Sequence, residues 1–156
     1  MTGEQPTQRA RQDKDLMAYC GLYCGDCFGY NGRIAELAKE LRKELRHAKF
    51  DRIAESLAGN PFFEVFGNYG QCYDVLGALV QFRCKKTCHG GGGPPFCEIR
   101  KCCQSKEIEG CWQCDQFRTC DKLDFLKAGH GDAPLKNLRK IRRAGVDGFL
   151  EGKRYW

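Results

Sequence analysis

Residues 84–120 read CKKTCHGGGGPPFCEIRKCCQSKEIEGCWQCDQFRTC, and this stretch determines how the chain can fold. From Cys84 to Lys122 the chain has 39 residues, of which eight are cysteines. The large apolar side chains of the segment are Phe96, Ile99, Ile108, Trp112 and Phe117. Burial of such side chains stabilises by roughly 1.5–3 kcal/mol each, whereas ordering the backbone costs about 1–2 kcal/mol per residue. Hydrophobic burial alone therefore does not fold this segment.

The cysteines can supply the missing stability as metal ligands or as disulfides. A structural zinc site contributes roughly 10–16 kcal/mol. Residues 1–15 are polar and lack the apolar core of a secretory signal, and no run of eighteen apolar residues exists. We therefore expect a cytoplasmic protein without a membrane span, in which thiols stay reduced and bind metal. Disulfides remain the alternative for a chain that is exported.

Four groups of cysteines have spacings typical of metal ligands. The first has the spacing C-x3-C-x2-C, and the last contains a compact C-x2-C turn. Neighbouring side chains diverge, so Cys102, which has Cys97 as a well-spaced partner, is favoured over Cys103. Cys72 lies on an apolar helical stripe and is interpreted as a buried core thiol. The candidate metal ligands are Cys20, Cys24, Cys27, Cys84, Cys88, Cys97, Cys102, Cys111, Cys114 and Cys120.

We expect these cysteines to hold two or three zinc ions, with an iron–sulfur cluster as the alternative. Ten ligands do not divide into four-ligand sites, so either two thiols are left over or further ligands complete a third site. His89, His130, Cys103 or Cys72 could be those ligands. The sequence does not choose among these arrangements.

The first cysteine group carries an alternative, enzymatic hypothesis. Three thiolates with an open fourth position make a reactive metal site, and the same spacing occurs in the cluster motif of radical S-adenosylmethionine enzymes. Asp26 replaces the aromatic residue usual before the third cysteine, and the chain lacks repeated strand–helix units. Asp26, Tyr23 and Tyr30 are the candidates for acid–base chemistry there. No complete catalytic set is recognisable, so whether the chain is an enzyme stays open.

Helical periodicity dominates outside the cysteine-rich lobe. Apolar residues recur at helical spacing from Ile34 to Leu57, with a break near Phe50 after which Asp51 could cap a second helix. Gly59 and Pro61 end that helix, and a further stripe runs from Tyr69 to Val80. A further helical segment has Asp132 as a possible cap, Pro134 in its first turn and Gly145 at its end. Val146, Phe149 and Leu150 suggest a short last helix after Gly145.

The predicted fold is mainly α, with a loop-rich, cysteine-coordinated metal-binding lobe and little regular β structure. Residues 1–15 are predicted to be a disordered polar tail, and residues 16–156 a single domain. The helical part covers about 31–82 and 132–152, and the cysteine-rich lobe covers 84–122. We expect the N-terminal cysteine group to take a ligand from that lobe.

The net charge of +6 is compatible with an acidic partner. A basic run, Lys136–Arg143, could contact nucleic acid, although such a run is more often a solvated helix face. Because no catalytic set stands out, the leading hypothesis is a structural zinc module that interacts with a protein partner.

Several motifs together resemble a known prokaryotic family. They are Tyr19-Cys20-Gly21-Leu22 with Cys24 and Cys27, Cys84 and Cys88 before a glycine-rich stretch, Cys97-Glu98-Ile99-Arg100-Lys101-Cys102, and Gly110-Cys111-Trp112-Gln113-Cys114 with Cys120. Over Tyr19–Leu150 the chain is similar to the cysteine-rich domain of unknown function 3795. The resemblance implies metal binding through the ten candidate cysteines and no established activity. It also implies that Cys72 and Cys103 are extras in this member.

Overall fold

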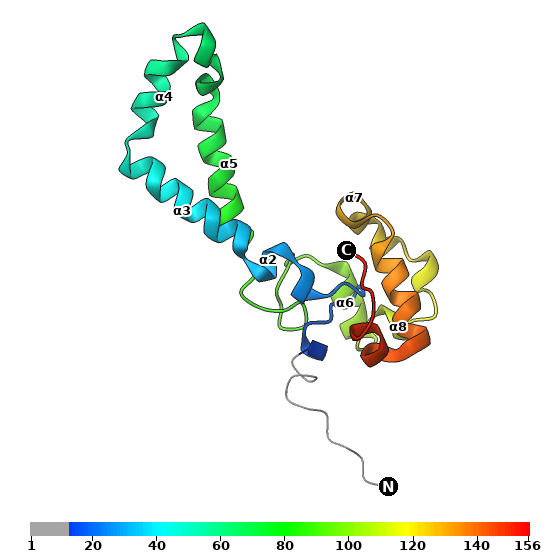
Figure 1. Ribbon diagram of the computed structural model, residues 1–156. Coiled ribbons are helices and arrows are strands. Elements are labelled where there is room, and N and C mark those ends of the chain that lie inside the picture. The colour runs from blue at the N-terminus through cyan, green and yellow to red at the C-terminus, as the bar shows by residue number, and fades with distance from the viewer. Residues whose placement is uncertain (1–12) are drawn as a thin grey trace. The chain divides into compact units, whose positions relative to one another are not determined.

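The computed structural model describes residues 13–156 (Figure 1). These residues divide into two compact units. A cysteine-rich unit contains the chain up to Tyr30 together with Lys85–Trp156, and a helical unit contains Asn31–Cys84. Helices are the only regular secondary structure among the described residues, apart from an isolated antiparallel bridge between Met17 and Tyr23. The prediction of a mainly α protein with little β structure is confirmed.

The predicted disordered tail lies largely outside the described residues. Of residues 1–15, only Asp13–Asp15 are described, and they form a helical turn. Lys14 in that turn pairs with Asp147 at 2.9 Å. The polar composition of this segment therefore does not prevent local order at its C-terminal end.

The helical unit is built around an antiparallel pair of helices. Its elements are α3 (Arg33–His47), α4 (Phe50–Ala58), the 3₁₀ segment η2 (Pro61–Asn68) and α5 (Tyr69–Gln81). The Arg42 guanidinium lies 4.4 Å from the centre of the Tyr73 ring, and Glu36 pairs with Arg83. Glu36, near the start of α3, meets Arg83, which follows the end of α5, whereas Arg42, later in α3, meets Tyr73, earlier in α5. The helices α3 and α5 therefore run in opposite directions.

The break near Phe50 is confirmed, but the predicted Asp51 cap is wrong. Lys49 adopts a left-handed conformation with φ 49° and occupies the N-cap position, so that α4 begins at Phe50. Asp51 lies inside the first turn, where a carboxylate still interacts favourably with the helix N-terminus. The helix therefore begins two residues earlier than a cap at Asp51 would place it.

The cysteine-rich unit contains one long helix and several short ones. They are η1 (Cys24–Asp26), α2 (Phe28–Asn31), α6 (Glu98–Ser105), η3 (Cys111–Gln113), η4 (Phe117–Thr119), η5 (Asp121–Leu126), α7 (Lys127–His130) and α8 (Ala133–Leu150). α2 extends one residue past the boundary between the units. The sequence analysis did not predict α6, although Ile99 and Cys103 are spaced for one helix face and are both buried.

The predicted last helix matches α8, including its interruption. Pro134 stands in the first turn, and Gly145 has a non-helical φ of 72° within the element. Asp132 occupies the N-cap position, but its side chain makes no cap hydrogen bond. The carboxylate pairs instead with Lys136 at 3.0 Å, so the Asp132 cap prediction is wrong in this respect.

The core of the cysteine-rich unit forms where the lobe packs on α8. Leu138, Ile141 and Phe149 of α8 are 0–2% exposed. They belong to one cluster with Ile99, Trp112 and Phe117 from the lobe. These three lobe residues are therefore buried, and the α8 side chains supply apolar surface that the lobe itself lacks.

The C-terminal segment is fastened to α8 by a buried amide. Asn137 is fully buried, and its side chain donates to the Tyr155 carbonyl at 2.8 Å and accepts from the Tyr155 N–H at 3.0 Å. Both hydrogen bonds satisfy a polar group that would otherwise be costly to bury.

Candidate metal centre

All twelve cysteines lie within the described residues, and each is a free thiol rather than half of a disulfide. Nine of the ten candidate ligands belong to the cysteine-rich unit. Cys84 is the last residue of the helical unit. Cys72, interpreted from the sequence as a core thiol, is exposed on α5, so its apolar environment was predicted wrongly.

The structure brings Cys88 to the cysteines of the N-terminal motif. Cys24 and Cys88 share a hydrogen bond between their sulfurs, and the charges of Cys20 and Cys27 also act on the Cys88 thiol. We call Cys20, Cys24, Cys27 and Cys88 the N-terminal group. Cys24 and Cys88, which are far apart in sequence, thus come into contact, and Cys20 packs against the same cluster.

Backbone hydrogen bonds hold the N-terminal part of this group. The Cys24 N–H donates to the Leu16 carbonyl at 2.7 Å, next to the Met17–Tyr23 bridge. The Cys27 N–H donates to the Cys24 carbonyl at 3.0 Å, closing η1. The C-x2-C spacing of Cys24 and Cys27 therefore forms a compact turn, as such motifs do at metal sites.

The glycine-rich loop positions Cys88. The Gly92 N–H donates to the Thr87 carbonyl at 2.7 Å, and a Cβ at Gly92 would lie 1.9 Å from the Lys86 carbonyl oxygen. Only glycine permits that close approach. Arg100 of α6 donates to the Gly92 carbonyl at 2.6 Å and to the Pro94 carbonyl at 2.9 Å. The loop is thereby attached to α6.

The protonation of the N-terminal group is uneven. A hydrogen bond from Cys88 lowers the pKa of Cys24 to about 7, whereas the same contact and burial raise the pKa of Cys88. Burial raises the pKa of Cys20 to about 12. One thiol of the group thus reaches the thiolate form near neutral pH, and the thiolate is the form that binds metal.

A second arrangement of sulfurs surrounds Lys106. Its ammonium lies 3.5 Å from the Cys114 sulfur, and this contact, followed by the charges of Cys102 and Cys120, raises the pKa of Lys106. We call Cys102, Cys114 and Cys120 the outer group. All three are partly buried.

The inner pair of Cys103 and Cys111 was not foreseen. Their sulfurs lie 3.7 Å apart, and both residues are buried in the core beside Trp112 and Phe117. The contact with Cys103, followed by burial, raises the pKa of Cys111, and the contact with Cys111 lowers the pKa of Cys103. The expected divergence of Cys102 and Cys103 is observed, because Cys102 faces Lys106 while Cys103 enters the core.

The second C-x2-C turn links the lobe to the N-terminal segment. The Cys114 N–H donates to the Cys111 carbonyl at 3.0 Å, closing η3, and the Cys111 N–H donates to the Tyr19 carbonyl at 2.8 Å. Cys97 precedes α6, and its charge acts on Cys20. Tyr19 and Cys20 therefore lie close to both C-terminal motifs.

The histidines named as possible extra ligands have aromatic neighbours. The His89 ring stacks on Tyr19, with 3.9 Å between ring centres. His130 packs edge-on against Trp156 at 4.8 Å. Burial lowers the pKa of both imidazoles.

The proposed acid–base residues of the N-terminal motif have structural partners. Asp26 forms a two-pronged ion pair with Arg154, with distances of 2.7 and 3.0 Å. The Tyr23 hydroxyl donates to Asp13 at 3.0 Å, and its pKa is raised by burial and by this contact. Arg154 also lies 4.5 Å from the centre of the Tyr23 ring.

Within residues 13–156, no three Cys, His, Asp or Glu side chains already converge at the spacing of a formed metal site. The donor chemistry nevertheless suits a thiophilic metal. The N-terminal group and the outer group both consist of cysteines only. Cys24 of the N-terminal group reaches the thiolate form near neutral pH, and the ammonium of Lys106 lies beside the outer group. Such sets favour zinc or iron–sulfur clusters over hard cations.

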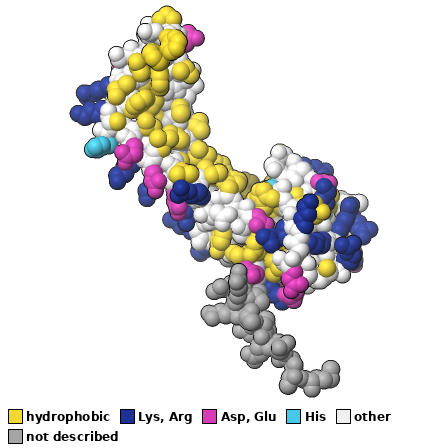
Figure 2. Space-filling model, viewed as in Figure 1, with side chains coloured by type: hydrophobic (Ala, Val, Ile, Leu, Met, Phe, Trp, Pro, Cys, Tyr) yellow, Lys and Arg dark blue, Asp and Glu magenta, His cyan; other side chains and the backbone are white. Residues whose placement is uncertain are grey.

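A hollow lined by arginines lies in the same unit. It has a volume of about 360 Å³, and its lining consists of Phe117, Arg118, Arg139, Arg142 and Arg143. Arg142 pairs with Asp115 at 2.5 Å, whereas Arg118, Arg139 and Arg143 have no ion pair among the described residues. Figure 2 shows Lys and Arg side chains gathered on one side of the cysteine-rich unit.

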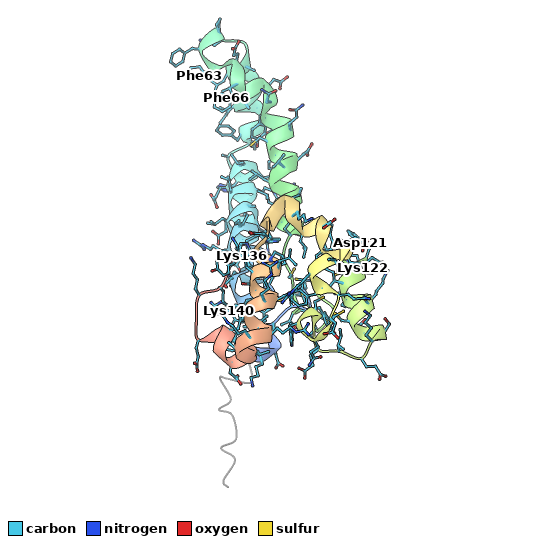
Figure 3. All side chains as sticks on the ribbon, turned by 90° about the vertical axis from the view of Figure 1, so that its right-hand side faces the viewer. Phe63, Phe66, Asp121, Lys122, Lys136 and Lys140 are labelled. Carbon is cyan, nitrogen blue, oxygen red and sulfur yellow. The ribbon has the colours of Figure 1, made fainter. Side chains whose placement is uncertain are left out.

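The basic run predicted from the sequence is not uniformly available to a ligand. Lys136 and Lys140 both project from α8, as Figure 3 shows. Lys136 pairs with Asp132, and Lys140 donates to the Lys153 carbonyl at 2.6 Å. Of the arginines of the run, Arg139 and Arg143 line the hollow without an ion pair among the described residues, whereas Arg142 pairs with Asp115. The sequence analysis missed Arg118, which comes from η4 rather than from α8.

No helix within residues 13–156 combines the length and the apolar character needed to cross a bilayer.

The fold and the thiol groups define a helical, cysteine-rich protein. Residues 16–125 match the family described as "Protein of unknown function (DUF3795)", and the chain belongs to this family. No curated protein shows significant similarity to the chain, and no solved structure does.

Proposed function

We propose that the chain is a zinc-binding protein in which thiolate-bound zinc stabilises the cysteine-rich unit as a scaffold for interactions. The observation that carries this proposal is the contact of Cys88 with Cys24 of the C-x3-C-x2-C motif, in the cluster on which Cys20 also packs. A fourth thiol beside the C-x3-C-x2-C motif supports a closed four-thiolate site. Closed sites of this kind are structural, because they leave no position for a substrate.

The enzymatic alternative needs an open position and a proton-transferring neighbour. The contact between Cys24 and Cys88 favours occupation of the fourth position by protein. Asp26 is held by Arg154, and Tyr23 by Asp13, so both nearest acid–base candidates already serve the fold. These contacts favour the structural role over an iron–sulfur or thiolate-zinc enzyme.

The outer group would hold a second zinc ion. Cys102, Cys114 and Cys120 supply three thiols, and Lys106 supplies a cation that compensates the negative charge of bound thiolates. Cys84 remains a proposed ligand on the basis of its C-x3-C spacing to Cys88. Zinc would fasten the short helices of the lobe, whose apolar residues alone provide too little stabilisation.

Alanine replacements in a metal-loaded preparation test this proposal. Zinc and iron per chain are measured for the wild type, for Cys88→Ala and for Cys72→Ala after anaerobic purification. We expect Cys88→Ala to lose about one zinc ion and Cys72→Ala, on the exposed face of α5, to lose none. Equal metal contents in all three proteins would overturn the assignment of Cys88. Iron in place of zinc would favour the cluster alternative.

A second candidate function is binding of nucleic-acid phosphates at the arginine hollow. Arg118, Arg139 and Arg143 approach one concave surface and lack carboxylate partners among the described residues. Guanidinium groups bind phosphate oxygens in a two-pronged manner. Phe117 is only 1% exposed, so base stacking on its ring is not part of this proposal.

Salt dependence of binding tests the phosphate site. Affinity for a fluorescent single-stranded oligonucleotide is measured over a range of salt concentrations for the wild type, Arg143→Ala and the control Lys39→Ala. We expect Arg143→Ala to weaken binding and to reduce the salt slope by about one phosphate contact. The α3 variant Lys39→Ala should match the wild type. Binding that does not weaken with added salt would exclude phosphate contacts.

A further inference from the structure

Residues 152–156 leave the end of α8 and return along the side of that helix (Figure 1). The Lys153 carbonyl accepts a hydrogen bond from Lys140 at 2.6 Å. About one turn earlier on α8, the buried Asn137 side chain binds both backbone groups of Tyr155, at 2.8 and 3.0 Å. Later residues of the segment thus meet earlier residues of the helix, so the two run antiparallel. We call residues 152–156 the strap.

Arg154 of the strap holds the turn that carries Cys24 and Cys27. Its guanidinium donates to both carboxylate oxygens of Asp26, which lies between the two cysteines in the sequence. The same guanidinium lies 4.5 Å from the centre of the Tyr23 ring. The side chains of Arg154 and Asp26 are 29% and 33% exposed, whereas both members of every other ion pair among the described residues are at least 40% exposed. This pair is therefore the most shielded of them, and a two-pronged, shielded pair contributes more than a surface pair does.

Tyr155, the next residue of the strap, packs on the small apolar cluster that contains Cys24. Cys20 and Cys88 pack on this cluster as well. The Lys136 ammonium of α8 lies 5.3 Å from the centre of the Tyr155 ring, a cation–π contact that holds the ring beside the helix. Cys24 itself is 6% exposed. The strap therefore forms part of the surface that separates this thiol from solvent.

Polar contacts fasten the strap more than burial does. None of its residues is fully buried, and Trp156 is 42% exposed. Segments with few buried apolar contacts open at a lower free energy than the core of a domain does. Cys103 belongs to such a core, because it is 1% exposed and lies in the cluster with Phe117 and Leu138. We therefore expect the strap to open while the core around Cys103 stays folded.

We propose that the strap is a cover that controls the access of small solutes to Cys24, and that the ion pair of Arg154 with Asp26 is its latch. The closed strap excludes a reagent from the thiol, and breaking the latch lets the strap lift and exposes it. Exchange of metal at the N-terminal group needs the same opening, and this part of the proposal rests on the zinc site proposed above. The strap lies outside residues 16–125, which match the family, so the latch is formed with a residue beyond the family pattern.

The test measures how fast individual cysteines of the full-length protein react with N-ethylmaleimide. The protein is purified without oxygen and keeps its metal, and labelled cysteines are identified by peptide mass spectrometry at successive times. The variants are Arg154→Ala and Tyr155→Ala, with Arg142→Ala as the matched control. Arg142 also forms an arginine–aspartate pair in this unit, with Asp115 at 2.5 Å, but it donates to the Cys114 carbonyl and so holds the second C-x2-C turn rather than the first.

We expect alkylation of Cys24 to become about 5–10-fold faster in Arg154→Ala, because loss of a two-pronged, partly buried ion pair raises the population of the open strap. Tyr155→Ala should also accelerate it, since the cluster then loses part of its cover. Arg142→Ala should match the wild type at Cys24. Cys103 is the internal reference, and its rate should be the same in Arg154→Ala as in the wild type. Circular dichroism confirms that the helices of each variant persist.

A double variant separates the latch from other effects of the substitutions. Arg154→Ala combined with Asp26→Ala should react at Cys24 no faster than the faster of the two single variants, because both substitutions break the same contact. An acceleration equal to the product of the two single effects would show that the residues act independently and would overturn the latch.

Equal rates at Cys24 in the wild type, Arg154→Ala and Tyr155→Ala would overturn the proposal. Equal acceleration of Cys24 and Cys103 would also overturn it, because the whole unit would then be losing stability. Zinc release to an excess of a chromogenic chelator should accelerate by the same factor as alkylation, and an unchanged release rate would overturn the part that concerns metal. Zinc per chain, measured in the same samples, tests the metal site separately, since faster alkylation of Cys24 is expected whether or not zinc is bound.

Discussion

Replacing the adjacent residues Cys102 and Cys103 by alanine, one at a time, is expected to have opposite effects on metal content and on packing. Cys103 is 1% exposed and lies 3.7 Å from the Cys111 sulfur. Cys102 is partly exposed and faces Lys106 together with Cys114. The two variants remove the same atom from neighbouring positions, so each serves as the control for the other.

The structure sets the magnitude for Cys103→Ala. Removal of a buried sulfur leaves a cavity that costs about 1–1.5 kcal/mol, and loss of the partner of Cys111 costs about 1 kcal/mol more. The free energy of unfolding should therefore fall by about 2 kcal/mol, which lowers Tm by about 4–8 °C for a chain of this size. Zinc content should stay at the wild-type value, because Cys103 belongs to the core cluster and to neither proposed zinc group.

Cys102→Ala is expected to behave in the reverse way. In metal-free protein the change should alter the free energy of unfolding by about 0.5 kcal/mol or less, as partly exposed positions do. In metal-loaded protein it should remove one zinc ion or raise the zinc dissociation constant about 100-fold or more. Metal analysis and urea unfolding of both variants, with and without a chelator, provide the assay. Loss of zinc from Cys103→Ala with retention in Cys102→Ala would refute the assignment of ligand and core thiol.

Two further predictions concern α8 and its surroundings. Asn137→Ala should lower the free energy of unfolding by about 2–4 kcal/mol, because two hydrogen bonds to Tyr155 are lost in a fully buried site. Limited proteolysis should then cleave the C-terminal segment faster. An unchanged cleavage rate would argue against the role of Asn137 in holding that segment. Burial lowers the pKa of His130, so the folded state binds its proton less well than the unfolded state does. Stability from this group is present above the unfolded pKa and is lost as the pH falls, and the wild type should lose more stability than His130→Phe between about pH 7 and pH 5. Equal losses in the two proteins would contradict the burial of His130.

Local periodicity was sufficient to predict the long helices. The stripe from Ile34 to Leu57 and its break near Phe50 correspond to α3 and α4, and Gly145 interrupts α8 as expected. These features depend on neighbours within a few residues, which the sequence displays directly. The cap positions were less predictable, because Lys49 adopts a left-handed conformation that its residue type does not favour.

The grouping of cysteines depended on contacts between distant segments. The spacing of Cys20, Cys24 and Cys27 is evident in the sequence. The sequence predicted only that this group takes a ligand from the lobe, and it did not show that Cys88 forms a hydrogen bond with Cys24. The contact of Cys103 with Cys111 was missed, although α6 could have been anticipated from the i, i+4 spacing of Ile99 and Cys103. Cysteine connectivity is not determined by sequence order.

The open flank of the helical unit could not be recognised from periodicity alone. The sequence showed that α3 and α5 have apolar stripes, yet the natural reading was that these stripes pack on each other. The contacts of Arg42 with Tyr73 and Gly77 show which side of each helix meets the other. Exposure of Leu41, one position before Arg42, then follows from the rotation of about 100° per residue.

The content and the structural effect of bound metal test the central claim most directly. Full-length protein is purified without oxygen from metal-supplemented cells, zinc and iron per chain are measured, and thermal unfolding is followed before and after chelation. We predict two or three zinc ions, no visible colour, and loss of cooperative unfolding in the cysteine-rich unit when zinc is removed. Iron with a brown colour, or a metal-free protein with the same unfolding transition, would contradict the proposed structural zinc sites.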